Sequence, residues 1–339
     1  MKPVGILVNP VSGRDVRRLA ARARSSTPQD KRNQVARAAI GAAAAGAERI
    51  LVLKEPFRIS TGAVENLRIP AKIEVLDLGA TIKPEDTPRA AEVMREAGCG
   101  AVVVLGGDGT NRAIARVWED APLVPISTGT NNTFPVRVEA TAAGAACGLV
   151  ASGRLDLDEV SRPAKLLRLE LEGQPSDLAL IDIVLLVDDM VGNLLPYEPE
   201  KLRTLVLSRA VASGVGVTPI GGLLRACGAD DEFGVAVECV GPDDGGRPLL
   251  APLSQGLYRR VYVKSWKRIE LGAVISIVGP GVLALDGDRE YKLAEGEEAR
   301  LRLLREGPHV IDVERALSLA GERELFFDLD GWHDALDEL

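Results

Sequence analysis

The residues best suited to chemistry lie in one short run, Gly106-Gly107-Asp108-Gly109-Thr110-Asn111, where three glycines surround a carboxylate. Glycine lets the backbone approach a ligand closely, and the amides that begin a following helix can bind an anion. The run therefore predicts a phosphate-binding turn. It matches neither the Walker loop, which ends in GKS or GKT, nor the dinucleotide fingerprint GxGxxG. The alternative is a tight strand-to-helix turn that Asp108 caps.

Asp108 is the candidate catalytic residue of this turn. A carboxylate held among phosphates could accept the proton of an attacking hydroxyl group. It could equally hold Mg²⁺, which prefers carboxylate and phosphate oxygens. The sequence leaves both roles open.

Two further polar turns have the same setting. The turn at 9–13 follows the apolar run 4–8, the turn at 127–134 follows the run 123–126, and the run 102–105 precedes the first turn. Such runs are typical of strands buried in a parallel sheet, whose carboxyl ends bind ligands. The three turns should therefore line one cleft suited to a polyphosphate. The residues expected to surround the nucleotide are Asn9, Ser12, Gly13, Gly106, Gly107, Gly109, Thr110, Asn111, Thr128, Gly129, Thr130, Asn131 and Asn132.

Helical segments separate these strands. Asp30 is expected to cap a long helix, and Thr87-Pro88 to begin another over 89–97. Further strands are expected at 50–53 and 72–76. The alternation of strand and helix predicts an α/β domain with a parallel sheet covered on both faces.

The three turns supply little positive charge to neutralise the phosphates, so most of it must come from other groups. None of the three turns contains lysine, and Arg14 and Arg112 are the nearest cations. We therefore expect ATP as the nucleotide, with Mg²⁺ carried by it. A metal site made by the protein alone is not expected, because the only histidines are His309 and His333 and no CxxC pair occurs.

Length and composition limit the classes of function. A chain of 339 residues favours two domains, and a net charge of -8 argues against nucleic acid as a partner. No apolar run approaches the roughly 18 residues of a membrane span, and the first is too short for a signal peptide. We expect a cytoplasmic protein that forms a homo-oligomer and has neither nucleic acid nor membrane as a partner. Most of the four cysteines are expected to be small buried residues.

The second half of the chain has a different pattern. Short runs, several of them alternating apolar and polar residues, are separated by Gly, Pro and Asp, which predicts an antiparallel, sandwich-like β domain. The clearest helices are expected at 199–212 and 312–320, and Asp188-Asp189 is interpreted as a solvated strand end. The expected units are an α/β nucleotide-binding domain over 1–140, a β-rich acceptor-binding domain over 141–310 and a C-terminal segment over 311–339.

Three motifs together resemble the NAD kinase and diacylglycerol kinase superfamily. They are NP-x-SG at 9–13, GGDGT at 106–110 and GT-x-N-x-F at 129–134. The resemblance implies an α/β domain, an all-β domain and a C-terminal segment that returns to the first domain. It also implies transfer of the γ-phosphoryl group of ATP to a hydroxyl group.

The acceptor motifs depart from those of NAD kinases. Ala179-Leu180-Ile181-Asp182 stands where they have ALNE, and Thr218-Pro219-Ile220-Gly221-Gly222 stands where they have TPTGS. With Asp286-Gly287, this blend is most similar to the AcoX-type branch, an ATP-NAD kinase relative named for acetoin catabolism. The resemblance implies acceptor contacts from Asp182, Gly221, Gly222 and Asp286. NAD or a related nucleotide is the first expected acceptor; a lipid kinase and a non-catalytic nucleotide-binding regulator are the alternatives.

Overall fold

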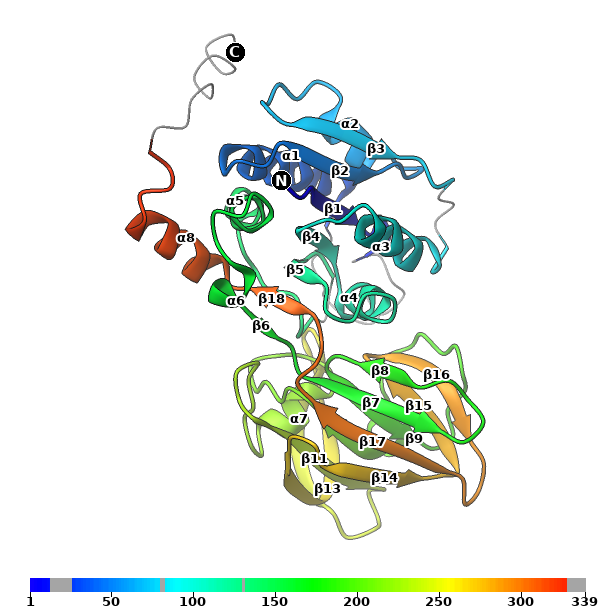
Figure 1. Cartoon of the computed structure of the whole chain (residues 1–339). Coiled ribbons are helices and arrows are strands. Elements are labelled where there is room, and N and C mark those ends of the chain that lie inside the picture. Colours follow the sequence, from blue (N-terminus) through cyan, green and yellow to red (C-terminus); the bar gives the residue numbers. More distant parts are fainter. Residues whose placement is uncertain (13–25, 80–82, 130–131, 328–339) are drawn as a thin grey trace.

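The computed structural model describes residues 1–12, 26–79, 83–129 and 132–327, and it consists of two domains with different architectures. Figure 1 shows an α/β domain at the top, a β domain below it, and the C-terminal strand and helix back beside the first domain. The two expected kinds of domain and the return of the C-terminal segment are therefore confirmed.

The first domain is built on one seven-stranded sheet. Its strand order is β3-β2-β1-β4-β5-β18-β6, and every neighbouring pair is parallel except β18 with β6. The strands are β1 (Val4–Val8), β2 (Arg49–Leu53), β3 (Lys72–Leu76), β4 (Ala101–Gly106), β5 (Pro122–Ser127), β6 (Ser161–Pro163) and β18 (His309–Ile311). The predicted parallel sheet is confirmed. Because β1, β4 and β5 are neighbours, the turns that follow them lie at one edge.

Helices cover both faces of this sheet. Two apolar clusters, one on each face, hold them there. One face carries α1 (Pro28–Ala44), α2 (Ile59–Val64), α5 (Ala140–Ala151), α6 (Leu157–Val160) and α8 (Val313–Glu322). The other face carries α3 (Asp86–Glu96) and α4 (Asp108–Ala115).

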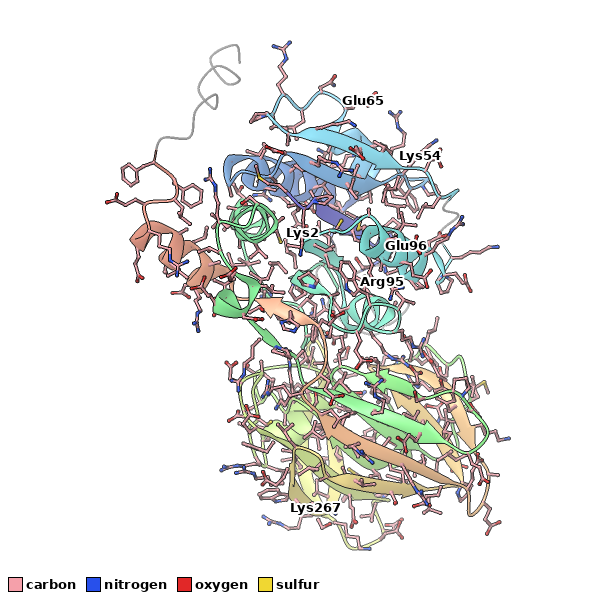
Figure 2. The ribbon with its side chains drawn as sticks, in the orientation of Figure 1. Lys2, Lys54, Glu65, Arg95, Glu96 and Lys267 are labelled. Carbon is pink, nitrogen blue, oxygen red and sulfur yellow. The ribbon has the colours of Figure 1, made fainter. Side chains whose placement is uncertain are left out.

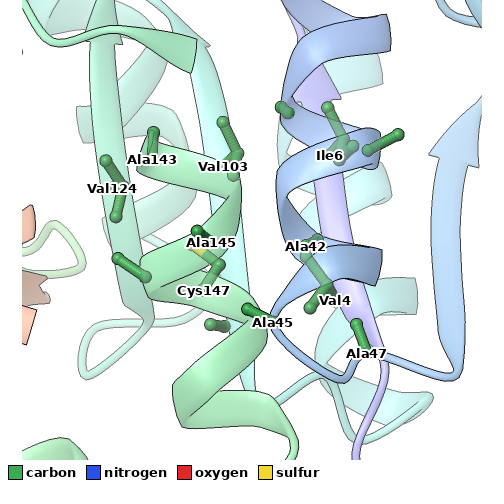
Figure 3. Packing of buried hydrophobic residues seen from close by; sticks show 14 of the residues in the cluster. Val4, Ile6, Ala42, Ala45, Ala47, Val103, Val124, Ala143, Ala145 and Cys147 are labelled. Atoms are coloured by element: carbon green, nitrogen blue, oxygen red, sulfur yellow. The ribbon is translucent and has the colours of Figure 1, made fainter. Parts of the chain in front are cut away.

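Helices α1 and α5 pack backbone against backbone. A Cβ atom added at Gly41 would lie 2.0 Å from the carbonyl oxygen of Thr141, and one at Gly144 would lie 2.0 Å from that of Ala38. Figure 3 shows small side chains, among them Ala42 and Ala145, filling the space between these helices and the strands. Helix α5 therefore belongs to the first domain. The domain boundary falls between β6 and β7, later in the chain than the predicted residue 140.

The second domain is antiparallel throughout, as predicted. Its larger sheet has the order β12-β13-β11-β10-β9-β15-β16, and its smaller sheet the order β14-β17-β7-β8. An apolar cluster between the sheets contains side chains of both. The strands are β7 (Leu166–Leu171), β8 (Asp177–Ala179), β9 (Asp182–Leu186), β10 (Leu202–Leu207), β11 (Phe233–Val240), β12 (Arg247–Ser254), β13 (Leu257–Glu270), β14 (Val274–Val278), β15 (Gly281–Leu285), β16 (Asp288–Leu293) and β17 (Glu298–Leu304).

Three predicted helix features differ from the structure. Helix α3 begins at Asp86 with Glu85 as its N-cap, so Thr87-Pro88 lies inside its first turn rather than before it. The helix predicted over 199–212 is wrong: the segment forms a short 3₁₀ turn, η2 (Pro199–Lys201), and then strand β10, which pairs with β9 and β11. Tertiary pairing outweighs the local preference there. In α1 the N-cap is Thr27 rather than Asp30, because the two side chains form a reciprocal capping box. The short helix α7 (Thr218–Gly222) completes the β domain.

The surface and the cysteines agree with the composition. Figure 2 shows charged side chains of both signs, such as Lys54, Glu65 and Lys267, projecting from the outer surfaces of the two domains. All four cysteines are buried and free. No helix in the described part of the chain is long and apolar enough to cross a membrane.

Candidate functional site

The three predicted turns meet at the carboxyl edge of the first sheet. Asn9 Nδ2 donates to Thr110 Oγ1 at 2.9 Å, and the hydroxyls of Ser12 and Thr128 lie 2.7 Å apart. The three turns border a cavity of about 660 Å³. Its lining includes Asn9, Ser12, Gly107, Asp108, Gly109, Thr110, Gly129 and Asn132, together with Leu53, Glu55, Pro56 and residues 83–88. A cavity of this size and lining can accommodate a nucleotide.

Asp108 begins helix α4 and lies between this cavity and a smaller one, since it lines both. Its Oδ1 accepts hydrogen bonds from the amides of Phe134 at 2.8 Å and Thr133 at 3.1 Å. Burial raises the pKa of Asp108 to about 7; the amide of Phe134 opposes this rise, and the nearby carboxylate of Asp286 adds to it. Such a carboxylate is suited to exchange a proton near neutral pH.

Lys31 of helix α1 holds the 9–12 turn by hydrogen bonds to its backbone. Its side chain is fully buried, and its Nζ donates to the carbonyl oxygens of Asn9, Pro10 and Ser12 at 2.8, 3.1 and 2.9 Å. No motif in the sequence predicts a role for this cation. Lys31 falls on the apolar stripe of α1 that also carries Val35 and Ala38. A lysine within such a stripe is the signal that could have revealed it.

Other residues predicted to surround the nucleotide make contacts within the turns. Asn132 Nδ2 donates to Ser127 Oγ at 2.8 Å, and Asn111 Nδ2 donates to the carbonyl oxygen of Gly107 at 2.9 Å. Asn111 is fully buried and Gly106 lies at the end of β4, so these two support the turn from inside. Gly13, Thr130 and Asn131 lie outside the described residues.

Replacing Gly107 by Val is expected to abolish ATP binding measured by calorimetry. Gly107 lines the large cavity, and a Cβ atom there would lie only 2.9 Å from Asn132 Oδ1. The branched side chain would displace Asn132 and occupy space that the phosphates of a bound nucleotide would need. Gly321→Val is the control, because a Cβ atom at Gly321 of helix α8 meets nothing within 4 Å. Unchanged affinity in Gly107→Val would place ATP elsewhere.

The smaller cavity, about 50 Å³, lies on the β-domain side of Asp108. Asp182 and Asp286 line it, together with Thr218, Ser254 and Arg289 and residues 195–197. The two aspartates are joined through the backbone, because each amide donates at 3.0 Å to an oxygen of the other residue. The structure thus brings two of the four predicted acceptor residues to one place beside Asp108.

The other two predicted acceptor residues lie elsewhere. Gly221 and Gly222 line neither cavity. A Cβ atom at Gly221 would lie 2.3 Å from the side chain of Leu207, and one at Gly222 would lie 2.3 Å from the amide nitrogen of Ala212. Close packing of α7 accounts for these glycines, and their contact with an acceptor stays a prediction.

Asp286 occupies a hairpin turn and also holds the backbone of another segment. Asp286 and Gly287 have φ values of 48° and 92°, in keeping with a type I′ turn between β15 and β16. The carboxylate accepts from the amides of Leu180 and Ile181 at 2.8 and 2.7 Å. Burial raises the pKa of Asp286, against the charge of Arg112 and these amides. Asp286 therefore fixes the 180–182 segment beside Asp108.

Arg112 lies in the interface between the domains. It is buried on helix α4 and makes five hydrogen bonds, two to backbone carbonyls and three to the carboxylates of Asp177 and Glu290. Arg116 binds the same two carboxylates, and Tyr291 donates to Asp177. Arg112, expected as a cation near the phosphates, lines the large cavity and also joins the α/β domain to the β domain.

Arg209 is a further buried cation near Asp108, and it comes from the β domain. Its Nη1 lies 3.4 Å from the carbonyl oxygen of Thr133, and its guanidinium lies 4.7 Å from the centre of the Phe134 ring. The positive charge opposes the rise in the pKa of Asp108. The sequence carries no local signal for this residue, which simply follows strand β10.

Among the described residues, no group of three His, Cys, Asp or Glu side chains could hold a metal.

Comparisons with known proteins agree with this arrangement. The ATP-NAD kinase N-terminal domain family matches residues 4–154, and the acetoin catabolism protein X C-terminal domain family matches residues 165–306. Acetoin catabolism protein X of Cupriavidus necator is 34% identical over 96% of this chain and 94% of its own.

A solved structure shows the same fold. Yeast NADH kinase, complexed with NADH, has a TM-score of 0.52 at 12% identity, over 97% of this chain and 89% of its own. A diacylglycerol kinase from Bacillus anthracis has a TM-score of 0.48 at 14% identity, over 91% of this chain and 96% of its own. The chain belongs to the acetoin catabolism protein X family, and its first domain matches the ATP-NAD kinase N-terminal domain family.

Proposed function

We propose that this protein is an ATP-dependent kinase that phosphorylates a hydroxyl group of NAD or a related nucleotide-like acceptor. The observation that carries the proposal is the position of Asp108 between a large and a small cavity. The acceptor oxygen attacks the γ-phosphorus of ATP, the bond from that phosphorus to the bridging oxygen breaks, and Asp108 takes the hydroxyl proton. The products are ADP and a phosphate monoester.

The large cavity is the proposed ATP site. Glycine turns, hydroxyls and the first amides of α4 are groups that bind phosphates. The N-cap residue of α4 is Gly107, so no N-cap side chain competes with a phosphate for those amides. The described cations that line the cavity are Lys83, Arg112 and Arg116, and the two arginines already bind carboxylates. Mg²⁺ bound to the triphosphate supplies the remaining positive charge.

A lipid acceptor is the second candidate, and exposed apolar side chains favour it. The segment 188–197 joins β9 to η2 and carries Met190, which is 70% exposed, and the half-exposed Val191, Leu194 and Leu195. Leu194 lines the large cavity and Leu195 the small one. An apolar acceptor would contact these side chains.

Mass spectrometry of products tests the proposal. The purified chain is incubated with ATP, Mg²⁺ and one acceptor at a time, namely NAD, NADH or diacylglycerol in mixed micelles. A phosphorylated pyridine nucleotide supports the first candidate, and phosphatidic acid supports the second. ATP binding without any phosphorylated product from a broad panel of acceptors would leave the non-catalytic regulator as the better description.

NAD is expected to be a weak substrate, with a KM well above the low-micromolar range. Asp182 is one methylene shorter than the glutamate of NAD kinases, and Ile181 replaces their asparagine. Each hydrogen bond lost to an uncharged group costs about 0.5–1.5 kcal/mol. The small cavity is also far below the roughly 300 Å³ of a ligand pocket, so NAD must displace residues 195–197. Asp182→Ala should raise the KM further; a low-micromolar KM that this change leaves unaltered would refute the placement.

A further inference from the structure

The small cavity contains a buried cation whose charge is incompletely matched. Arg289 begins strand β16 and lines the cavity, and its side chain is only 1% exposed. Its Nη1 donates to the carbonyl oxygen of Gly287 at 3.3 Å. Its Nη2 is buried and has no hydrogen-bond partner in the described part of the chain. A buried guanidinium normally has its donors satisfied, because leaving one unpaired is costly.

Among the residues that the structure describes, one carboxylate binds Arg289, and it is a weak partner. Asp189 Oδ2 lies 3.4 Å from Arg289 Nε, longer than the roughly 2.7–2.9 Å of a charge-assisted hydrogen bond. The other oxygen of Asp189 accepts from the amide of Met190 and from Asn193 Nδ2 at 2.8 and 2.5 Å. The interpretation of Asp189 as a solvated strand end is therefore wrong, since its side chain is 3% exposed. Its charge is shared with its own loop.

An aromatic ring covers the guanidinium. The ring centre of Tyr197 lies 4.4 Å from Arg289 Cζ, which holds the planar group in one orientation. Tyr197 belongs to the 195–197 stretch that closes the small cavity. The cavity thus has a fixed, incompletely paired cation together with the carboxylates of Asp108, Asp182 and Asp286.

We propose that Arg289 binds an anionic group of the phosphoryl acceptor, so that the acceptor is a hydroxyl compound that also carries a carboxylate or phosphate. The proposal rests on the proposed kinase function. The hydroxyl group faces Asp108 and Asp182, which would repel an anion, and the anion pairs with the planar fork of Arg289. Arg289 then selects the acceptor and takes no part in the proton transfer.

Binding of three small probes tests this without requiring turnover. Glycerol, glycerate and glycerol 1-phosphate share hydroxyl groups and differ in having no anion, a carboxylate or a phosphate. Each is titrated by calorimetry into the full chain with saturating ADP and Mg²⁺, so that the large cavity is occupied. We expect at least one of the two anions to bind, and the tighter of the two identifies the anionic group that Arg289 prefers. Glycerol should bind at least tenfold more weakly than that anion.

Variants of Arg289 assign the effect to this residue. Arg289→Met should weaken binding of the anionic probe by about 10- to 100-fold, the loss of one or two charge-assisted hydrogen bonds. Arg289→Lys keeps the charge and should recover part of the affinity. Arg260→Met, at an exposed position on β13, is the control for a change in overall charge. Circular dichroism checks that each variant is folded.

Three results would overturn the proposal: equal affinity for glycerol and the anions, no binding of either anion at millimolar concentration, or equal anion affinity in wild type and Arg289→Met.

In kinase assays Arg289→Met should raise the KM of an anionic acceptor and leave kcat near its wild-type value. Anion binding that depends on Arg289, without any phosphorylated product, would contradict the kinase proposal alone. Transfer to glycerol and glycerate with equal efficiency would contradict the anion proposal alone.

Discussion

Replacing Asp108 by Asn is expected to lower the rate of phosphoryl transfer by about 10²–10⁴-fold while the protein remains folded. The amide oxygen of Asn can still accept the hydrogen bonds that Thr133 and Phe134 donate to Asp108 Oδ1, so the turn should keep its shape. What is lost is the ability to take up the hydroxyl proton. Steady-state kcat with ATP and the best acceptor measures the loss. Asp243→Asn, on an exposed loop, is the matched control. Undiminished turnover in Asp108→Asn would end this assignment.

The pH dependence separates the two roles left open for Asp108. With its pKa raised to about 7, a base at this position is mostly protonated in mild acid and becomes active as pH rises. The rate should therefore be about tenfold below its plateau at roughly pH 6 and level off above about pH 8. A carboxylate that holds Mg²⁺ would be ionised well below pH 7. A rate that stays constant over this range would favour the metal-binding role.

Replacing Arg112 by Met is expected to destabilise the protein by about 3–5 kcal/mol, the cost of breaking a buried ion pair from one side. The change removes the buried guanidinium and leaves the buried Asp177 and Glu290 with only the partly exposed Arg116 as a partner from this helix end. Unfolding in urea, followed by circular dichroism, measures the free energy. Arg116→Met is the matched control, because Arg116 binds the same carboxylates but is 37% exposed, so its loss should cost much less. Equal costs would show that burial of Arg112 has no special effect.

Acid should weaken the same network. Burial alone would raise the pKa of Asp177, but the hydrogen bond from Arg116 and the charge of Arg112 lower it to about 2. Because the folded state lowers this pKa, the stabilisation is complete above the unfolded value of about 4 and is lost as pH falls toward 2. The difference in stability between wild type and Arg112→Met should therefore narrow over that interval. A constant difference would contradict this role for Asp177.

Local sequence patterns determined the frame of the site. Apolar runs that end in glycine-containing turns placed Asp108 and the 9–13 and 127–134 turns after three strands of one parallel sheet. This prediction depends only on strand length, glycine content and the geometry of parallel strands, all of which are encoded within a few residues. The antiparallel pattern of the second half was predictable for the same reason. The motifs in these turns also indicated the superfamily.

Tertiary structure alone decided how the site is completed. Lys31, Arg209 and Arg289 reach it from three different elements, and Arg112 contacts carboxylates 65 and 178 residues away in the chain. The segment 202–207 became a strand because β9 and β11 lie on either side of it. Such contacts depend on which surfaces pack together and on the need to pair each buried charge. Neither property is recorded in the spacing of neighbouring residues, so the sequence located the phosphate turns, while only the fold decided which charges surround them.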